Sequence, residues 1–172
     1  ILKKGIFEKN EIIVSNLTEE GSRRSKEKLE KLVNEYGIND RVKFHGFHPE
    51  KEIPKYLKDA DAALLILKPN PVFEMTIPAK LQTYLACGVP ILGCVSGEGK
   101  RIIEESKAGI VSEDISVDGL VKVCNQFIEL PIDLLNEYKE RSYCYGKSNF
   151  NKNKLISDLE KYMKKKRKYP EA

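Results

Sequence analysis

The chain has 172 residues, enough for one domain with a sizeable hydrophobic core. Its composition, 41% hydrophobic and 33% charged with a formal net charge of +4, is typical of a folded, mildly basic protein and excludes a largely disordered chain. No apolar run reaches the roughly 18 to 20 residues that a membrane-spanning helix requires. No signal-peptide pattern is visible, and because the first residue is Ile1 rather than methionine, we expect a piece of a longer protein.

The first half of the chain alternates between two patterns. Short apolar runs at 11–15 and 42–45 predict buried strands. Between them, apolar residues recur at helical spacing, and Gly37 is expected to end that helix: Leu29, Leu32, Val33 and Tyr36. Residues 48–60 predict a further helix, with Pro54 in its first turn.

The second half continues the alternation. Residues 62–67 are apolar throughout, which predicts a strand covered on both faces. The next expected elements are a helix at about 78–87, a strand at 89–94, a helix at about 98–107 and a strand at 109–112. An apolar helical stripe follows at 120–128, and the polar, helical tail ends in the basic run 164–168.

Strands that alternate with helices predict βαβ units joined by right-handed crossovers. The expected fold class is therefore α/β, with a Rossmann-like, doubly wound parallel sheet in one domain. We assign residues 1–150 to this domain and residues 151–172 to a basic C-terminal helix or tail.

The cysteines and histidines form no recognisable metal motif. The histidines are His45 and His48, and none of the four cysteines stands in a C-x-x-C pair: Cys87, Cys94, Cys124 and Cys144. We therefore expect reduced thiols in the core of a cytoplasmic protein, and no metal site.

Ligands of such sheets bind at the carboxyl ends of the strands, on the loops that enter helices. The loop 15–24 offers Arg23 and Arg24 to a phosphate, although exposed arginines at a helix start are more often only solvated. The loop 46–52 offers His48, which fits either contact with a flat base or an ordinary turn before a proline. The loop 96–101 contains G-x-G, but an isoleucine at 102 leaves the dinucleotide fingerprint incomplete.

The loop leading to the helix at 78–87 has the most suggestive chemistry. Pro78 suits a first helical turn, and the free N–H groups of that turn favour a phosphate or carboxylate. Lys80 would add a positive charge, and Glu74 could accept hydrogen bonds from sugar hydroxyls. The alternative is an ordinary surface loop that caps a core helix, with Lys80 solvated. The residues alone leave both interpretations open.

From about 11 to 109 the chain resembles the C-terminal, nucleotide-sugar-binding domain of the retaining GT-B glycosyltransferases that carry an E-x(7)-E motif. The resemblance rests on four segments in the family's order: EIIVSN with KLEKLVNEYGINDRVKFHGF, EIPKYLKDADAALLIL, IPAKLQTYLACGVPIL and SGEGKRIIEESKAGIVS. It is similar in particular to enzymes of capsule, O-antigen and other envelope polysaccharides, which have P-S-K-L where this chain has P-A-K-L.

The resemblance implies roles for individual residues. Glu74 takes the place of the first motif acid, which contacts the donor sugar and is the catalytic candidate. The loop 46–48 corresponds to the base-contacting segment, with Gly46, Phe47 and His48. The donor and its phosphates would face two helix starts: Ile77, Pro78, Ala79 and Lys80 at one, and Ser96, Gly97, Glu98 and Gly99 at the other.

The chain departs from the family at the second motif acid, which grips the ribose. Counted back from ACG at 86–88, its place falls on Thr83, and counted forward from Glu74 it falls on Gln82. Neither residue is a carboxylate, so a charge-assisted bond to the ribose is lost.

The resemblance also implies partners that lie outside the sequence. They are a nucleotide diphosphate sugar and an N-terminal acceptor domain. The family also has an earlier strand, which would lie before residue 1, and its absence would leave the sheet without its central strand. The expected activity is sugar transfer in the complete enzyme and none in residues 1–172 alone, without a metal or other cofactor and without nucleic acid. The expected location is the cytoplasm, with the basic tail allowing peripheral contact at the inner membrane face. A GT-B nucleotide-sugar epimerase and a non-catalytic interaction module remain the alternatives.

Overall fold

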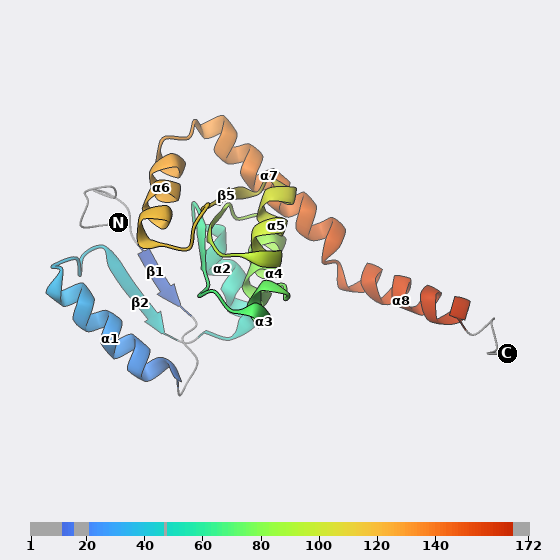
Figure 1. Cartoon of the computed structure of the whole chain (residues 1–172), viewed down its shortest axis with the longest axis horizontal. Coiled ribbons are helices and arrows are strands. Elements are labelled where there is room, and N and C mark those ends of the chain that lie inside the picture. Colours follow the sequence, from blue (N-terminus) through green and yellow to red (C-terminus); the bar gives the residue numbers. More distant parts are fainter. Residues whose placement is uncertain (1–11, 16–20, 47, 167–172) are drawn as a thin grey trace.

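The structure is a computed structural model that describes residues 12–15, 21–46 and 48–166 (Figure 1). The first half contains β1 (Ile12–Ser15), α1 (Gly21–Glu35), β2 (Val42–Gly46), the 3-10 helix η2 (Glu50–Glu52), α2 (Ile53–Lys58), β3 (Ala63–Ile66), α3 (Pro71–Glu74) and α4 (Ala79–Ala86). The second half contains β4 (Ile91–Cys94), α5 (Gly97–Ser106), β5 (Gly109–Val111), α6 (Val117–Ile128), α7 (Ile132–Asn149) and α8 (Lys152–Lys166).

All strand pairs are parallel, as the alternation of strands and helices predicts, but the strands form two sheets. One sheet pairs β1 with β2, and the other has the order β3-β4-β5. Figure 1 shows β1, β2 and α1 together on one side of the molecule. In chain order, the division falls between β2 and β3.

The hydrophobic core surrounds the three-stranded sheet. All four residues of β4 are buried, because α5 and α6 both pack against this central strand. One cluster gathers side chains of β3, α4, β4 and α5, and a second joins β4 to α6. Among the side chains described before residue 60 (26–45, 48–49 and 51–59), only Val33 and Ile53 are buried hydrophobic residues.

The prediction that the strand at 62–67 is covered on both faces is wrong at its end. Ala63 and Leu65 are buried, and Leu64 packs partly against the cluster beneath α6, but 52% of Ile66 is exposed. Ile66 points to the same face of the sheet as Leu64, because side chains two residues apart in a strand share a face. It is exposed because the cluster that joins β4 to α6 includes Leu64 but not Ile66.

Three local features differ from the sequence prediction. The four-residue helix α3 was not expected; Asn70 caps it by accepting a hydrogen bond from the Val72 N–H at 2.8 Å. Pro78 is the extended residue before α4 rather than part of its first turn. Cys144 is exposed on α7, whereas Cys94 and Cys124 lie in the core and Cys87 is partly buried.

Helix α7 packs against α4, and α8 then leads away from the rest of the molecule (Figure 1). The buried Ser142 hydroxyl of α7 donates to the Val89 carbonyl at 2.9 Å. Among the helices described, none has an apolar stretch long enough to cross a bilayer.

Candidate functional site

The start of α4 presents unpaired backbone donors. Pro78 precedes the helix with φ −61° and ψ 131°, and its carbonyl accepts the first helical bonds from Leu81 and Gln82 at 3.0 and 3.4 Å. The N–H groups of Ala79 and Lys80 belong to the first turn, which has no partners within the helix. Such N–H groups, aligned with the helix dipole, favour an anion.

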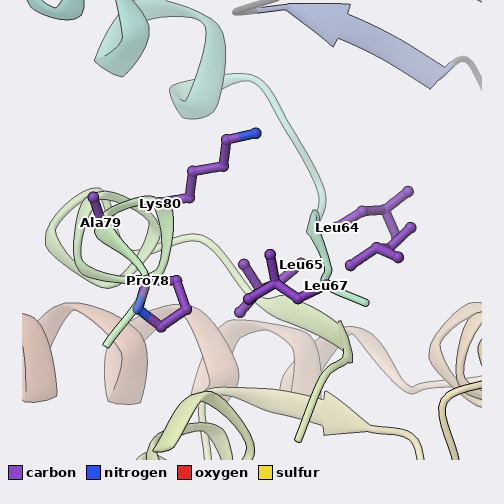
Figure 2. A pocket seen from close by; sticks show the side chains of 7 residues that line it. Leu64, Leu65, Leu67, Pro78, Ala79 and Lys80 are labelled. Carbon is purple, nitrogen blue, oxygen red and sulfur yellow. The ribbon is translucent and has the colours of Figure 1, made fainter. Parts of the chain in front are cut away.

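A cavity of about 390 Å³ lies beside this helix start (Figure 2). Pro78, Ala79 and Lys80 line one side of it, and the apolar residues 64–67 of β3 and its carboxyl end line the other. Lys80 is exposed, so its ammonium group is accessible to an anionic ligand. The site therefore combines an apolar wall with a positively charged rim.

Glu74 lies next to the start of α5, although 22 positions separate it from Ser96. The Ser96 hydroxyl donates to the Glu74 carboxylate Oε1 at 2.9 Å. Gly97 has φ +62°, and a Cβ built there would overlap the backbone of Glu74. A Cβ at Gly99 would lie 3.7 Å from the ring of Pro78. The structure thus brings together the predicted residues of both helix starts and the candidate catalytic acid.

The predicted donor-contacting residue Glu98 has a partner within α5. Its carboxylate accepts hydrogen bonds from Arg101 Nε and Nη2, the shortest of them 2.8 Å long. These hydrogen bonds hold the pKa of Glu98 below its usual value. Arg101 also bonds Glu105, whose other oxygen accepts from the Tyr145 hydroxyl at 3.1 Å. The negative charge of the Glu98 carboxylate is therefore already balanced by Arg101 in the same helix.

His48 forms a separate cluster around η2 and α2. Its Nδ1 lies 3.3 Å from Glu52 Oε2 and 3.2 Å from the Tyr56 hydroxyl, and the His48 and Tyr56 ring centroids are 4.4 Å apart. Its Nε2 is buried and has no hydrogen-bond partner. Gly46 ends β2 in register with Ser15, whereas Phe47 lies outside the described residues. The neighbouring side chains thus hold the ring through Nδ1 and ring contacts.

The two candidates for the ribose contact lie side by side in α4. The Thr83 hydroxyl donates to the carbonyl of Ala79 at 3.2 Å, one turn earlier. Gln82 and Thr83 are both partly exposed. Because successive helical residues point about 100° apart, only one of them can face a given ligand group.

Two features of this site escaped sequence reasoning. The bond between Ser96 and Glu74 joins residues far apart in the chain, and no local pattern marks it. The pairing of Glu98 with Arg101 could have been found, because the two residues are three apart in a predicted helix. In the described part of the chain, no group of three or more His, Cys, Asp or Glu side chains is arranged to hold a metal ion.

The family described as "Glycosyl transferases group 1" matches residues 8–145, which is most of the chain. The chain belongs to the group 1 glycosyltransferases. This confirms the resemblance found in the motifs. The matched span includes Glu74 and both helix starts of the candidate site.

A curated relative is WcaL of Escherichia coli (strain K12), whose name assigns it provisionally to colanic acid biosynthesis as a glycosyltransferase. It is 26% identical over 133 residues, which cover 77% of this chain and 33% of WcaL. The chain thus spans about a third of the length of this relative.

Two solved structures have a similar fold. Anabaena Alr3699/HepE in complex with UDP superimposes with a TM-score of 0.76 at 16% identity, covering 91% of this chain and 41% of that one. Sucrose-phosphate synthase from Thermosynechococcus elongatus gives a TM-score of 0.79 at 14% identity, covering 95% and 40%. At these identities the likeness confirms the predicted Rossmann-like α/β fold of this group 1 glycosyltransferase chain.

Proposed function

We propose that this chain is the donor-binding half of a retaining glycosyltransferase that moves a sugar from a nucleotide diphosphate sugar to an acceptor in the synthesis of a cell-surface polysaccharide or glycolipid. The observation that carries the proposal is the convergence of Glu74 with the starts of α4 and α5, together with the cavity that the start of α4 lines. Membership of the family and the UDP complex of the HepE structure support a nucleotide diphosphate as the ligand.

In the proposed reaction the bond between the anomeric carbon and the diphosphate oxygen breaks, and the diphosphate keeps the electron pair. A new bond forms between the anomeric carbon and an acceptor hydroxyl oxygen, whose proton passes to the departing diphosphate. The N–H groups at the start of α4 and the Lys80 ammonium stabilise this developing charge. Glu74 accepts hydrogen bonds from donor-sugar hydroxyls. Gly46 and His48 contact the base, and Thr83 or Gln82 contacts the ribose.

The start of α4 and Lys80 supply positive potential to the diphosphate. We therefore propose a reaction that uses no resident metal or organic cofactor.

We propose that the acceptor binds a second, N-terminal domain that faces this cavity. Residues 1–172 alone should then bind the nucleotide diphosphate without transferring sugar, and turnover by this chain alone would contradict its role as half of an enzyme.

Two other functions compete with this one. A nucleotide-sugar epimerase shares the donor half, and an interaction module would keep the fold without the ligand. The neutral side chains of Thr83 and Gln82 favour the interaction module. Isothermal titration of the chain with a panel of nucleoside diphosphates distinguishes an interaction module from a transferase or an epimerase, because an interaction module should bind none of these ligands. Formation of an epimerised free nucleotide sugar by the complete protein would replace the transferase proposal.

We further propose a peripheral position at the inner membrane face, through α8. Five exposed apolar side chains recur along this helix at spacings of one, three and four residues: Leu155, Ile156, Leu159, Tyr162 and Met163. Eight of the 30 Lys and Arg residues lie in 152–172, against three of the 26 Asp and Glu residues. Each basic residue near an anionic bilayer contributes about 1 kcal/mol to binding.

Vesicle binding tests this location. The chain should bind phosphatidylglycerol vesicles more strongly than phosphatidylcholine vesicles, and deletion of residues 152–172 should remove the difference. Equal binding of the complete and shortened chains would exclude the membrane role and leave the apolar side of α8 as a contact for another part of the enzyme.

A further inference from the structure

Ser96 occupies the position before α5 where a serine normally caps its own helix, but its side chain makes no capping hydrogen bond. Its hydroxyl instead donates to Glu74 Oε1 at 2.9 Å. Ser116 shows the usual arrangement at the start of α6, where its Oγ accepts from the Gly119 N–H at 2.9 Å. The Ser96 hydroxyl is therefore directed to another part of the chain.

The backbone around Ser96 fixes this arrangement. Gly97 adopts φ +62° and leaves no space between its Cα and the backbone of Glu74. Any larger residue at position 97 would push α3 away from α5. The short helix α3, capped by Asn70, ends at Glu74 itself. Both partners of the hydrogen bond therefore start from backbone positions that are held together by direct contact.

Glu74 needs such a restraint because its side chain is exposed and has three rotatable bonds. The Glu98 carboxylate, at the start of the same helix as Gly97, is paired with Arg101. A bond from Ser96 to Oε1 leaves Oε2 available to accept a hydrogen bond from a ligand hydroxyl.

We propose that Ser96 is a positioning residue that orients the Glu74 carboxylate toward the donor sugar before the donor binds. The inference rests on the proposed role of Glu74 in donor binding. It also alters the role expected for Ser96 from the sequence, which was direct contact with the donor phosphates. A serine hydroxyl has one proton to donate. While that proton is donated to Glu74, it is not available to a phosphate.

A double-mutant cycle in the complete enzyme that contains this chain tests the proposal. Ser96→Ala should lower kcat about tenfold, the effect expected for a hydrogen bond to a charged group, with little change in affinity for the nucleoside diphosphate. In a Glu74→Gln background the same substitution should lower kcat less than about twofold. Ser96→Thr, which keeps the hydroxyl in the extended conformation observed, should restore most of the activity.

Ser116→Ala is the matched control, because it removes a serine at a helix start that does not contact Glu74. It should leave kcat unchanged at a temperature where the enzyme is folded. Equal losses from Ser96→Ala in the two backgrounds would contradict the proposal. Weaker diphosphate binding with unchanged kcat would also contradict it and would return Ser96 to direct phosphate contact.

A second measurement does not depend on catalysis. The carboxyl-carbon NMR resonance of Glu74 in the chain should shift in Ser96→Ala and stay in place in Ser116→Ala. An unshifted resonance in Ser96→Ala would show that the hydrogen bond is absent in solution and would overturn the proposal. Absence of sugar transfer by the complete wild-type protein, with the resonance shifted as expected, would instead refute the proposed function.

Discussion

Gly146 in α7 lies directly against the backbone of Leu85 in α4: a Cβ at position 146 would be 2.7 Å from the Leu85 carbonyl carbon. An alanine in a helix is usually more stable than a glycine by about 1 kcal/mol. Here the added methyl group must push two backbones apart, which places the cost in the upper part of the usual range for overpacking, about 2 to 3 kcal/mol. We predict that Gly146→Ala lowers the free energy of unfolding by about 1 to 2 kcal/mol, measured by urea denaturation.

Ser148→Ala provides the comparison, since position 148 lies on the exposed side of the same helix. It should change the stability by less than about 0.5 kcal/mol. A Gly146→Ala variant as stable as the wild type would show that α7 and α4 do not pack as closely as the structure indicates.

The two sheets should differ in their resistance to local opening. In the described part of the chain, the β1–β2 sheet makes no strand pair with the three-stranded sheet, and the residues given for both core clusters lie beyond 60. Regions with few buried apolar contacts open at a lower free energy than the global unfolding reaction. Amides of β2 and α1 should therefore exchange with deuterium faster than those of β4 and α5. Equal protection factors in the two regions would contradict this division.

The pair of Glu98 and Arg101 makes part of the stability depend on pH. Because hydrogen bonds from Arg101 lower the pKa of Glu98 in the folded chain, the contribution is present above the ordinary pKa of 4.5. It is lost as the pH falls through the lower, folded value. In an NMR titration, Arg101→Gln should raise the pKa of Glu98 toward 4.5, whereas Lys100→Gln, whose partner is Glu104, should not change it. An unchanged pKa in Arg101→Gln would refute the assigned cause.

Restoring a carboxylate in α4 should reveal which residue faces the ribose. We predict that Thr83→Glu strengthens nucleoside diphosphate binding about tenfold, because a charged acceptor bonds the ribose hydroxyls. The helix fixes the spacing from ACG to position 83, whereas the loop after Glu74 can vary in length. Gln82→Glu should have little effect. The gain should vanish with a 2′,3′-dideoxynucleotide, and a gain in Gln82→Glu alone would favour the count from Glu74.

Periodicity predicted the core elements correctly because their patterns depend on local spacing. The stripe at 120–128 became α6, and the glycine at 37 ends α1 with φ +64°. Helix α3 was missed because its four residues are too few to show a period, although Asn70 and Pro71 form a recognisable helix start. The exposure of Ile66 was missed because an apolar run does not show how far the covering helix extends.

The site was predictable to the extent that it lies on loops at the carboxyl ends of strands. Sequence reasoning selected the segments of Glu74, Pro78 and Ser96, which the structure brings together. It could not predict which hydroxyl meets which carboxylate, because that depends on the close approach of α3 and α5. The left-handed conformation of Gly97 permits this approach, and G-x-G alone did not indicate it.

Binding of uridine diphosphate compared with uridine, in the wild type and in Lys80→Ala, tests the central claim most directly. If the diphosphate lies on the start of α4, Lys80→Ala should weaken binding of the diphosphate about five- to tenfold, because only this ligand carries the charge that Lys80 meets. Uridine affinity should change less than about twofold, and Lys122→Ala, an exposed lysine of α6, should affect neither ligand. A crystal structure of the complex should place phosphate oxygens within hydrogen-bond distance of the backbone of residues 77–80. Unchanged diphosphate affinity in Lys80→Ala, with the ligand bound elsewhere, would contradict the account and leave the loop before α4 as a helix cap.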